Sequence, residues 1–331
     1  MASGKLRESA AMRLDVTFVI AAYNAEASVA RAIRSALDQK DVSVEVIVVD
    51  DCSRDRTVEI ARSFPEESVH VVSLGQNRGP GGARNVGFSV ARGRWVAVLD
   101  SDDTVAPERL ARMVARAEGA NAQGVVDNLE VVRDADGGRE LMFESAQLAE
   151  KSELTLADFI AANIMFEETF SYGYMKPIFQ REFVEQHALR YDEHLRIGED
   201  YIFLASALAK GARCAIEPEA GYAYHIREGS ISRVMELHHI EAMLAADALF
   251  VGGHEMDSAA RNAQARRTRS LKEAAAFLSL VQHLKDRAPL KAAGAALRDP
   301  IALRHLKMPI AARLRRLAAT FQTRRALGQA G

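Results

Sequence analysis

The first ~120 residues alternate between short apolar runs and amphipathic segments, and this alternation restricts the fold more than any other feature of the chain. Apolar runs typical of buried strands occupy residues 16–20, 44–49, 69–74 and 95–99. Helices are predicted between them, at 26–37, from 53 or 55 to about 63, and at 83–91. Strands that alternate with helices form parallel sheets with helices on both faces. The sequence therefore predicts a doubly wound, mainly parallel α/β sheet.

The pattern becomes less regular after residue 121. A strand is predicted at 124–132, a turn at 136–138 and a helix at 155–162, and from residue 231 onward the chain becomes helical and rich in alanine. This change of composition predicts an α/β domain over residues 14–235 and a helical C-terminal extension over residues 236–331.

Acidic residues follow two of the predicted strands. Asp50 and Asp51 end the second strand, and Asp100, Asp102 and Asp103 follow the fourth. The carboxyl ends of parallel strands lie on one edge of a sheet, where α/β proteins bind their ligands. Two acidic clusters there would repel each other unless a cation or hydrogen-bond donors lay between them, which favours a metal site facing a polar ligand. Either cluster alone is equally well explained as the cap of a helix.

Composition and cysteine usage exclude several classes of protein. The 331 residues, 48% hydrophobic and 27% charged, suffice for one large core or two unequal ones. Cys52 and Cys214 fit neither a zinc spacing nor a disulfide framework, which favours a reducing cytosol. Residues 1–13 lack the apolar core of a signal peptide, and no apolar run approaches the roughly 20 residues of a membrane span. We therefore expect a cytoplasmic protein.

Four segments, in this order and at these spacings, resemble the signature of family 2 glycosyltransferases. They are Thr17-Phe-Val-Ile-Ala-Ala-Tyr23-Asn24-Ala-Glu26, Val49-Asp50-Asp51-Cys-Ser-Arg-Asp-Arg-Thr57, Asn77-Arg-Gly79-Pro-Gly-Gly-Ala-Arg84-Asn85 and Asp100-Ser-Asp102-Asp103. A dinucleotide-binding fingerprint would instead place glycines after the first strand, where Ala-Ala-Tyr-Asn stands. The resemblance covers about residues 14–235 and implies a GT-A fold, a Rossmann-like nucleotide-diphospho-sugar transferase domain.

The resemblance implies that these segments bind a UDP-sugar, with UDP-glucose the expected donor. Tyr23 would pack beside the uracil and Asp51 would accept a hydrogen bond from its ring N–H, which suits an aromatic face and a carboxylate. Asn24 and Glu26 are assigned to the same donor site, and Asp100 would contact the ribose. The alternative for Tyr23 is an ordinary core aromatic.

The same resemblance implies a divalent metal. Asp102 would ligate Mg²⁺ or Mn²⁺ bridging the two phosphates, where a cation neutralises the charge on the departing nucleoside diphosphate. Arg84 would assist there, unless it is a solvated helix residue. His225 would be a third ligand and Arg227 a diphosphate contact, although each could equally have an ordinary surface role.

Gly198-Glu199-Asp200-Tyr-Ile-Phe resembles the family's second acidic motif, on the acceptor side. An acceptor hydroxyl is a poor nucleophile, and a carboxylate must take its proton as the new bond forms. We assign this general base to Asp200, with Glu199 orienting the acceptor or a nearby loop. The alternative is that both acids only favour the first turn of a helix through its dipole.

The motifs that are missing from the sequence also bear on function. Processive synthases of this family carry Gln-x-x-Arg-Trp and membrane helices, whereas the only tryptophan here is Trp95, inside a predicted strand. The resemblance thus implies an inverting transfer of one sugar to a saccharide acceptor, a lipid-linked intermediate of succinoglycan-type exopolysaccharide assembly. A nucleotidyltransferase and a non-catalytic sugar-nucleotide-binding module at the membrane surface remain alternatives.

The C-terminal segment differs from the rest of the chain in charge. From Leu290 to Gly331 nine Lys or Arg residues face the single acid Asp299, a charge of +8 against −10 for the remainder. A helix after Pro309 would place an apolar stripe beside arginines, which suits either an anionic membrane or packing on the α/β domain. Nucleic acid is not expected, because no aromatic platform accompanies the charge.

Overall fold

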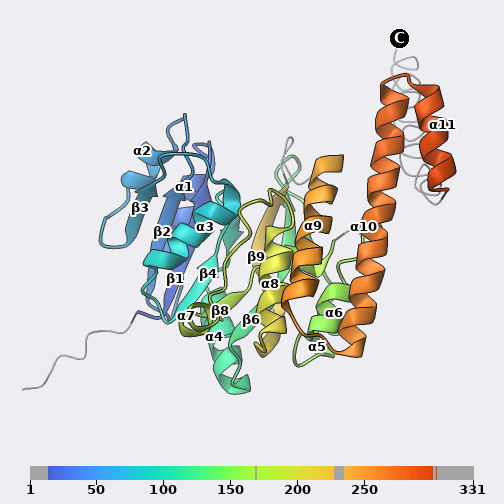
Figure 1. Ribbon diagram of the computed structural model, residues 1–331. Coiled ribbons are helices and arrows are strands. Elements are labelled where there is room, and N and C mark those ends of the chain that lie inside the picture. Colours follow the sequence, from blue (N-terminus) through green and yellow to red (C-terminus); the bar gives the residue numbers. More distant parts are fainter. Residues whose placement is uncertain (1–13, 168–169, 227–234, 301–302, 304–331) are drawn as a thin grey trace, which may run out of the picture.

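The computed structural model describes residues 14–167, 170–226, 235–300 and 303, which form a central nine-stranded sheet flanked by helices (Figure 1). The strand order is β3-β2-β1-β4-β8-β6-β9-β5, and β7 pairs with β6 at the side of this path. The predicted α/β architecture, mainly parallel and flanked by helices, is confirmed.

The parallel half of the sheet comes from the first hundred residues. Its strands are β1 (Val16–Ala22), β2 (Val44–Asp50), β3 (Val69–Ser73) and β4 (Trp95–Val98). β1 lies between β2 and β4, and its two pairings and the pairing of β2 with β3 all run parallel. The apolar side chains of β1, β2 and β4 are almost fully buried because helices cover both faces. All four predicted strands are confirmed, and all four point their carboxyl ends to one edge.

The second half of the sheet is mixed. It contains β5 (Thr104–Val105), β6 (Gly124–Arg133), β7 (Arg139–Leu141), β8 (Ile178–Gln180) and β9 (Cys214–Ile226). β8 runs antiparallel between β4 and β6, with Ala97 opposite Ile178. The residues just before β8 therefore lie beside the carboxyl end of β4.

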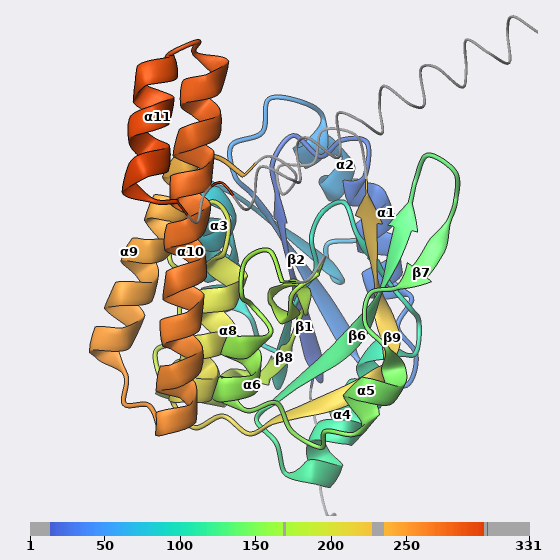
Figure 2. The ribbon, with the colours of Figure 1, turned by 90° about the vertical axis from the view of Figure 1, so that its right-hand side faces the viewer.

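Helices cover the two faces of the sheet (Figures 1 and 2). On one face lie α1 (Val29–Leu37), α2 (Thr57–Arg62) and α4 (Arg109–Ala120), and on the other lie α3 (Gly79–Val90) and α8 (Glu199–Ala209). α3 begins four residues before the predicted 83–91, at Gly79, whose φ of +79° favours glycine. Phe203 of α8 stacks on Tyr191 and meets Phe88 of α3 edge-on, which joins these two helices.

Of the remaining helices, some lie between β7 and β9 in the sequence and the others come after β9. They are α5 (Ser145–Ala149), α6 (Leu156–Ala161), a 3₁₀ turn at Tyr172–Tyr174, α7 (Arg181–Gln186), α9 (Leu237–Gly253), α10 (Ser258–Lys285) and α11 (Pro289–Arg298). Phe250 of α9 and Ala260 of α10 belong to the main hydrophobic core. Helical character is thus observed between residues 237 and 298, while the division into two domains near residue 235 stays a prediction.

None of the helices in the described part of the chain combines the length and apolar character that a bilayer span requires. The predicted helix after Pro309 lies outside the described residues.

Candidate functional site

Two loops at the carboxyl ends of β1 and β2 are joined by side chains from the first motif. Asn24, with a left-handed φ of +49°, accepts a hydrogen bond from the Arg54 N–H at 2.9 Å through its Oδ1. The carboxylate of Glu26 accepts one from the Arg56 N–H at 3.1 Å. Both residues, predicted for donor binding, thus hold one loop against the other. The Tyr23 side chain is half exposed, so this residue is not a core aromatic.

Asp51 is buried just past the carboxyl end of β2. Its two oxygens accept hydrogen bonds from the backbone N–H groups of Arg78 at 2.6 Å and Gly79 at 2.8 Å, at the start of α3. Burial raises the pKa of Asp51, and these two donors partly offset that effect. Asp51 therefore connects β2 to the third motif, and its second lone pairs remain for a further donor.

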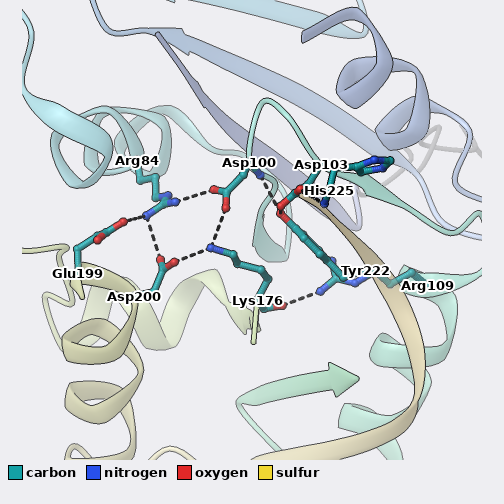
Figure 3. Close-up of polar contacts among 9 residues, drawn as sticks. All are labelled: Arg84, Asp100, Asp103, Arg109, Lys176, Glu199, Asp200, Tyr222 and His225. Atoms are coloured by element: carbon teal, nitrogen blue, oxygen red, sulfur yellow. Dashed lines mark hydrogen bonds and ion pairs between the residues drawn. The ribbon is translucent and has the colours of Figure 1, made fainter. Parts of the chain in front are cut away.

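Past β4, Asp100 lies in a cluster of charged side chains (Figure 3). Arg84 of α3 contacts its Oδ1 at 2.6 Å, and Lys176, just before β8, contacts its Oδ2 at 2.8 Å. Burial alone would raise the pKa of Asp100, but the positive charges of Lys176 and Arg84 lower it well below its usual range.

The acidic motif at the start of α8 enters the same cluster. One nitrogen of Arg84, Nη1, contacts Glu199 at 2.7 Å and Asp200 at 2.9 Å, and Lys176 contacts Asp200 at 2.5 Å. Burial and the neighbouring Asp200 raise the pKa of Glu199. These side chains are called here the ion-pair cluster, which brings the motif after β4 into contact with the motif at the start of α8. Its members are Arg84, Asp100, Lys176, Glu199 and Asp200. Arg84 is buried, so the alternative of a solvated helix residue is wrong.

On the other side of Asp100 lies a hydrogen-bonded group, called here the Tyr222 network. The Tyr222 hydroxyl donates to Asp103 at 2.8 Å and accepts from the Asp100 N–H at 3.1 Å, and the His225 N–H donates to Asp103 at 2.8 Å. Burial, together with the charges of Asp100 and Asp102, raises the pKa of Asp103 well above its usual range. The network fixes the turn that follows β4.

The predicted metal ligands Asp102 and His225 lie at this turn and on the facing strand β9. The two ring nitrogens of His225 lie 2.8 Å from Asp134 and 3.1 Å from the Thr104 hydroxyl. Among the described residues no three His, Cys, Asp or Glu side chains are arranged to hold an ion. Mg²⁺ is commonly held by one or two carboxylates together with substrate phosphates. A carboxylate at Asp102 fits an ion shared with a diphosphate and does not fit an all-protein cage. Arg227 lies outside the described residues.

A fully buried ion pair contacts both the ion-pair cluster and the Tyr222 network. Arg109, on α4, binds the two carboxylate oxygens of Asp127 on β6, both at 2.8 Å. Its guanidinium also donates to the Lys176 carbonyl at 2.6 Å and lies 5.3 Å from the ring centre of Tyr222. One side chain thus positions the backbone of Lys176 and the ring of Tyr222.

Sequence reasoning named most of the residues that the structure brings together here and left out three parts of the arrangement. It assigned no role to Lys176, Tyr222 or the pair of Arg109 and Asp127. A lysine immediately before an apolar strand was the only local signal, because the contacts of these residues join segments far apart in the chain.

Comparisons with known proteins agree with this architecture. The family model described as Glycosyl transferase family 2 matches residues 17–185. The chain is 59% identical over 307 residues to "Succinoglycan biosynthesis protein ExoO" of Rhizobium meliloti (strain 1021). The matched region covers 93% of this chain and 88% of that protein. It is 32% identical to "Succinoglycan biosynthesis protein ExoU" of the same organism, over 89% of this chain and 86% of that protein.

Two solved structures share the fold. The crystal structure of Staphylococcus aureus TarS 1-349 in complex with UDP-GlcNAc matches with a TM-score of 0.62 and 18% identity, over 87% of this chain and 92% of that one. The mannosyltransferase PcManGT of Pyrobaculum calidifontis, in complex with GDP-Man and Mn²⁺, matches with a TM-score of 0.59 and 19% identity, over 91% of this chain and 81% of that one. With these matches and the motifs at the sheet edge, the chain belongs to glycosyltransferase family 2, and it is a GT-A glycosyltransferase.

Proposed function

We propose that this glycosyltransferase moves one sugar from a UDP-sugar, with UDP-glucose the expected donor, to a hydroxyl of a lipid-linked saccharide, with inversion at the anomeric carbon. The names of the two Rhizobium meliloti relatives support a role in assembling succinoglycan or a related exopolysaccharide. The TarS complex with UDP-GlcNAc shows that a protein of this fold binds a UDP-sugar.

One observation supports this proposal above all others. The ion-pair cluster joins Asp100, at the end of a donor-side strand, to Asp200, at the start of the acceptor-side helix, through shared contacts with Arg84 and Lys176. A glycosyltransferase must place its base beside the carbon that leaves the donor. In the cluster, Arg84 and Lys176 bridge these two carboxylates, which supports placing the base Asp200 next to the end of β4.

The reaction at this site would be a single displacement. The acceptor oxygen bonds to the anomeric carbon while the bond from that carbon to the diphosphate breaks, and the electron pair leaves with UDP. The acceptor proton passes to Asp200. Each oxygen of this carboxylate receives one contact from Arg84 or Lys176, so a second lone pair on each is left for the proton.

The donor side would be bound by residues of the first two motifs. The half-exposed ring of Tyr23 is available to pack beside uracil, and the remaining lone pairs of Asp51 suit its ring N–H. Asn24 and Glu26 would act on the donor by holding these loops in place. A divalent ion held by Asp102, with His225 as a further ligand and Arg227 as a diphosphate contact, would neutralise charge on the departing UDP.

One donor screen separates this function from its alternatives. A panel of UDP-sugars is screened for UDP release with Mg²⁺ or Mn²⁺, with wild type and Asp102→Ala in parallel. We expect UDP release from one donor, strongly reduced in the variant. Release of pyrophosphate would indicate a nucleotidyltransferase, and donor binding without any release would indicate a binding module.

The metal assignment has its own test. Asp102→Asn should weaken UDP-sugar binding in the presence of Mn²⁺ while hardly affecting metal-free UDP binding, because its proposed role is to hold the ion. Calorimetric titration with and without Mn²⁺ measures both. An unchanged metal dependence would move the ligand role to another acid of the turn.

We also propose that the basic C-terminal segment contacts an anionic membrane on the cytoplasmic side, where a lipid-linked acceptor would lie. Deleting residues 309–331 should release the protein from anionic vesicles and leave donor hydrolysis intact, since every donor motif precedes residue 235. Vesicle sedimentation measures the first effect and UDP release the second. An insoluble truncated protein would show that the segment packs on the domain instead.

A further inference from the structure

Lys176 occupies an unusual position for a lysine. Its side chain is only 8% exposed, and its ammonium lies 2.8 Å from Asp100 and 2.5 Å from Asp200. Burial opposes the charge, but these two carboxylates raise the pKa of Lys176 above its usual value. A buried ammonium between two carboxylates is therefore a permanent cation of this site.

The two cations of the cluster contact different oxygens of the same two carboxylates. Arg84 contacts Oδ1 of Asp100 and Oδ1 of Asp200, whereas Lys176 contacts Oδ2 of each. A carboxylate held at one oxygen can still rotate about its Cβ–Cγ bond, but one held at both oxygens cannot. Lys176 thus completes the fixation of both groups, which Arg84 alone would leave incomplete.

The backbone of Lys176 is fixed as well. It precedes β8, whose antiparallel pairing with β4 brings it beside Asp100. Its carbonyl accepts a hydrogen bond from Arg109, which is itself held by the buried carboxylate of Asp127. Because the backbone of Lys176 is held in place, its ammonium can fix the positions of the two carboxylates that it contacts.

We propose that Lys176 is a positioning residue for sugar transfer, which holds the base Asp200 in a fixed orientation relative to Asp100 on the donor side. This inference rests on the proposed function, in which Asp200 takes the acceptor proton. Without Lys176, Asp100 and Asp200 would each keep one contact to Arg84 and would repel each other. The base would then turn away from its working geometry. Asp100 would keep its contact to Arg84, and the nucleotide contacts at Tyr23 and Asp51 would be unaffected.

The test measures UDP release from UDP-glucose with Mn²⁺, using the full chain. Lys176→Met should lower kcat by about 10- to 100-fold, the effect expected for a misplaced reacting group, and should change the donor KM by less than about threefold. Lys176→Arg, which keeps the charge, should recover most of kcat. Lys151→Met, which removes an ammonium 2.6 Å from Asp158 outside the cluster, should leave both constants as in wild type.

The decisive comparison is made in the Asp200→Asn background. If Lys176 acts through Asp200, the added Lys176→Met change should lower kcat there by less than about threefold, since residues that act as a unit are non-additive. An equal loss in both backgrounds, or a rise in donor KM with unchanged kcat, would overturn the proposal. If Lys176→Met does not fold, Lys176→Gln is used instead, because it keeps hydrogen-bond donors at this position. It is then measured in both the wild-type and the Asp200→Asn background.

The same variants separate this inference from the function on which it rests. Full activity of Asp200→Asn would contradict the assignment of the base itself. An inactive Asp200→Asn together with a fully active Lys176→Met would contradict only the role of Lys176.

Discussion

Two polar groups meet at Asp100, and they are built in opposite ways (Figure 3). In the ion-pair cluster, Asp100, Glu199 and Asp200 are held by the full charges of Arg84 and Lys176. In the Tyr222 network, the donors that the described residues offer to the buried carboxylate of Asp103 are a hydroxyl and a backbone N–H.

The difference indicates different tasks. Asp200 keeps 19% of its side chain exposed and has charged partners, so it can meet a substrate while its orientation is held. Asp103 is sealed from solvent, and its contacts connect the turn after β4 to strand β9. We therefore expect the ion-pair cluster to take part in the reaction and the Tyr222 network to stabilise the fold around it. Substitutions in the two groups should separate kinetic effects from effects on stability.

The largest effect is expected at Asp200. Asp200→Asn keeps the shape, and its one carbonyl oxygen can still accept from either Arg84 or Lys176. It cannot take the acceptor proton, so kcat should fall by about 10²–10⁴-fold. The donor KM should change little, because a base acts mainly in the transition state. Steady-state kinetics should show this loss in a protein that unfolds at a temperature near that of wild type.

Glu199→Gln is the matched comparison and should have a milder effect, since its predicted role is orientation. If Glu199→Gln loses activity and Asp200→Asn keeps it, the two roles are reversed. If both variants stay active, the proposed mechanism is wrong.

A second substitution tests the buried pair of Arg109 and Asp127, which contacts both the ion-pair cluster and the Tyr222 network. Arg109→Met leaves the carboxylate of Asp127 buried without its partner, and removing one member of such a pair costs about 3–5 kcal/mol of unfolding free energy. Urea denaturation measures the loss. Lys40→Met removes an exposed partner of Glu108 and should have no measurable effect. A stable Arg109→Met would show that the site does not depend on this pair.

The smallest effect is expected in the Tyr222 network. Tyr222→Phe removes the hydroxyl that donates to Asp103 and should cost about 0.5–1.5 kcal/mol at acidic pH, where Asp103 is protonated, the range for a hydrogen bond between neutral groups. The folded-state pKa of Asp103 is raised above its unfolded value of 3.8, so its contribution to stability is complete below pH 3.8 and is lost as pH rises through the folded pKa.

This sign predicts how the cost of Tyr222→Phe depends on pH. The hydroxyl offsets part of the penalty for ionising Asp103, so the variant should lose more stability at neutral pH than at acidic pH. Thermal unfolding across that range gives the measurement. A cost that is the same at every pH would mean that the hydroxyl does not act through Asp103.

The sequence by itself determined the parallel half of the sheet and the positions of the motifs along it. Apolar runs of strand length and acids directly after them are local signals, so β1 to β4 and the placement of Asp51 and Asp100 could be predicted within a few residues. The resemblance to a family then supplied roles for Tyr23, Asp102 and Asp200, which no periodicity could have shown.

The tertiary structure alone decided which charges face each other. The contacts of Arg84 with Glu199 and Asp200 join residues 115 and 116 positions apart, and that of Tyr222 with Asp103 spans 119. The insertion of β8 between β4 and β6 placed Lys176 beside Asp100, and the local sequence could not identify that partner. Strand order and long-range pairing depend on how the whole chain buries its apolar surface, and this information is not contained in any single segment.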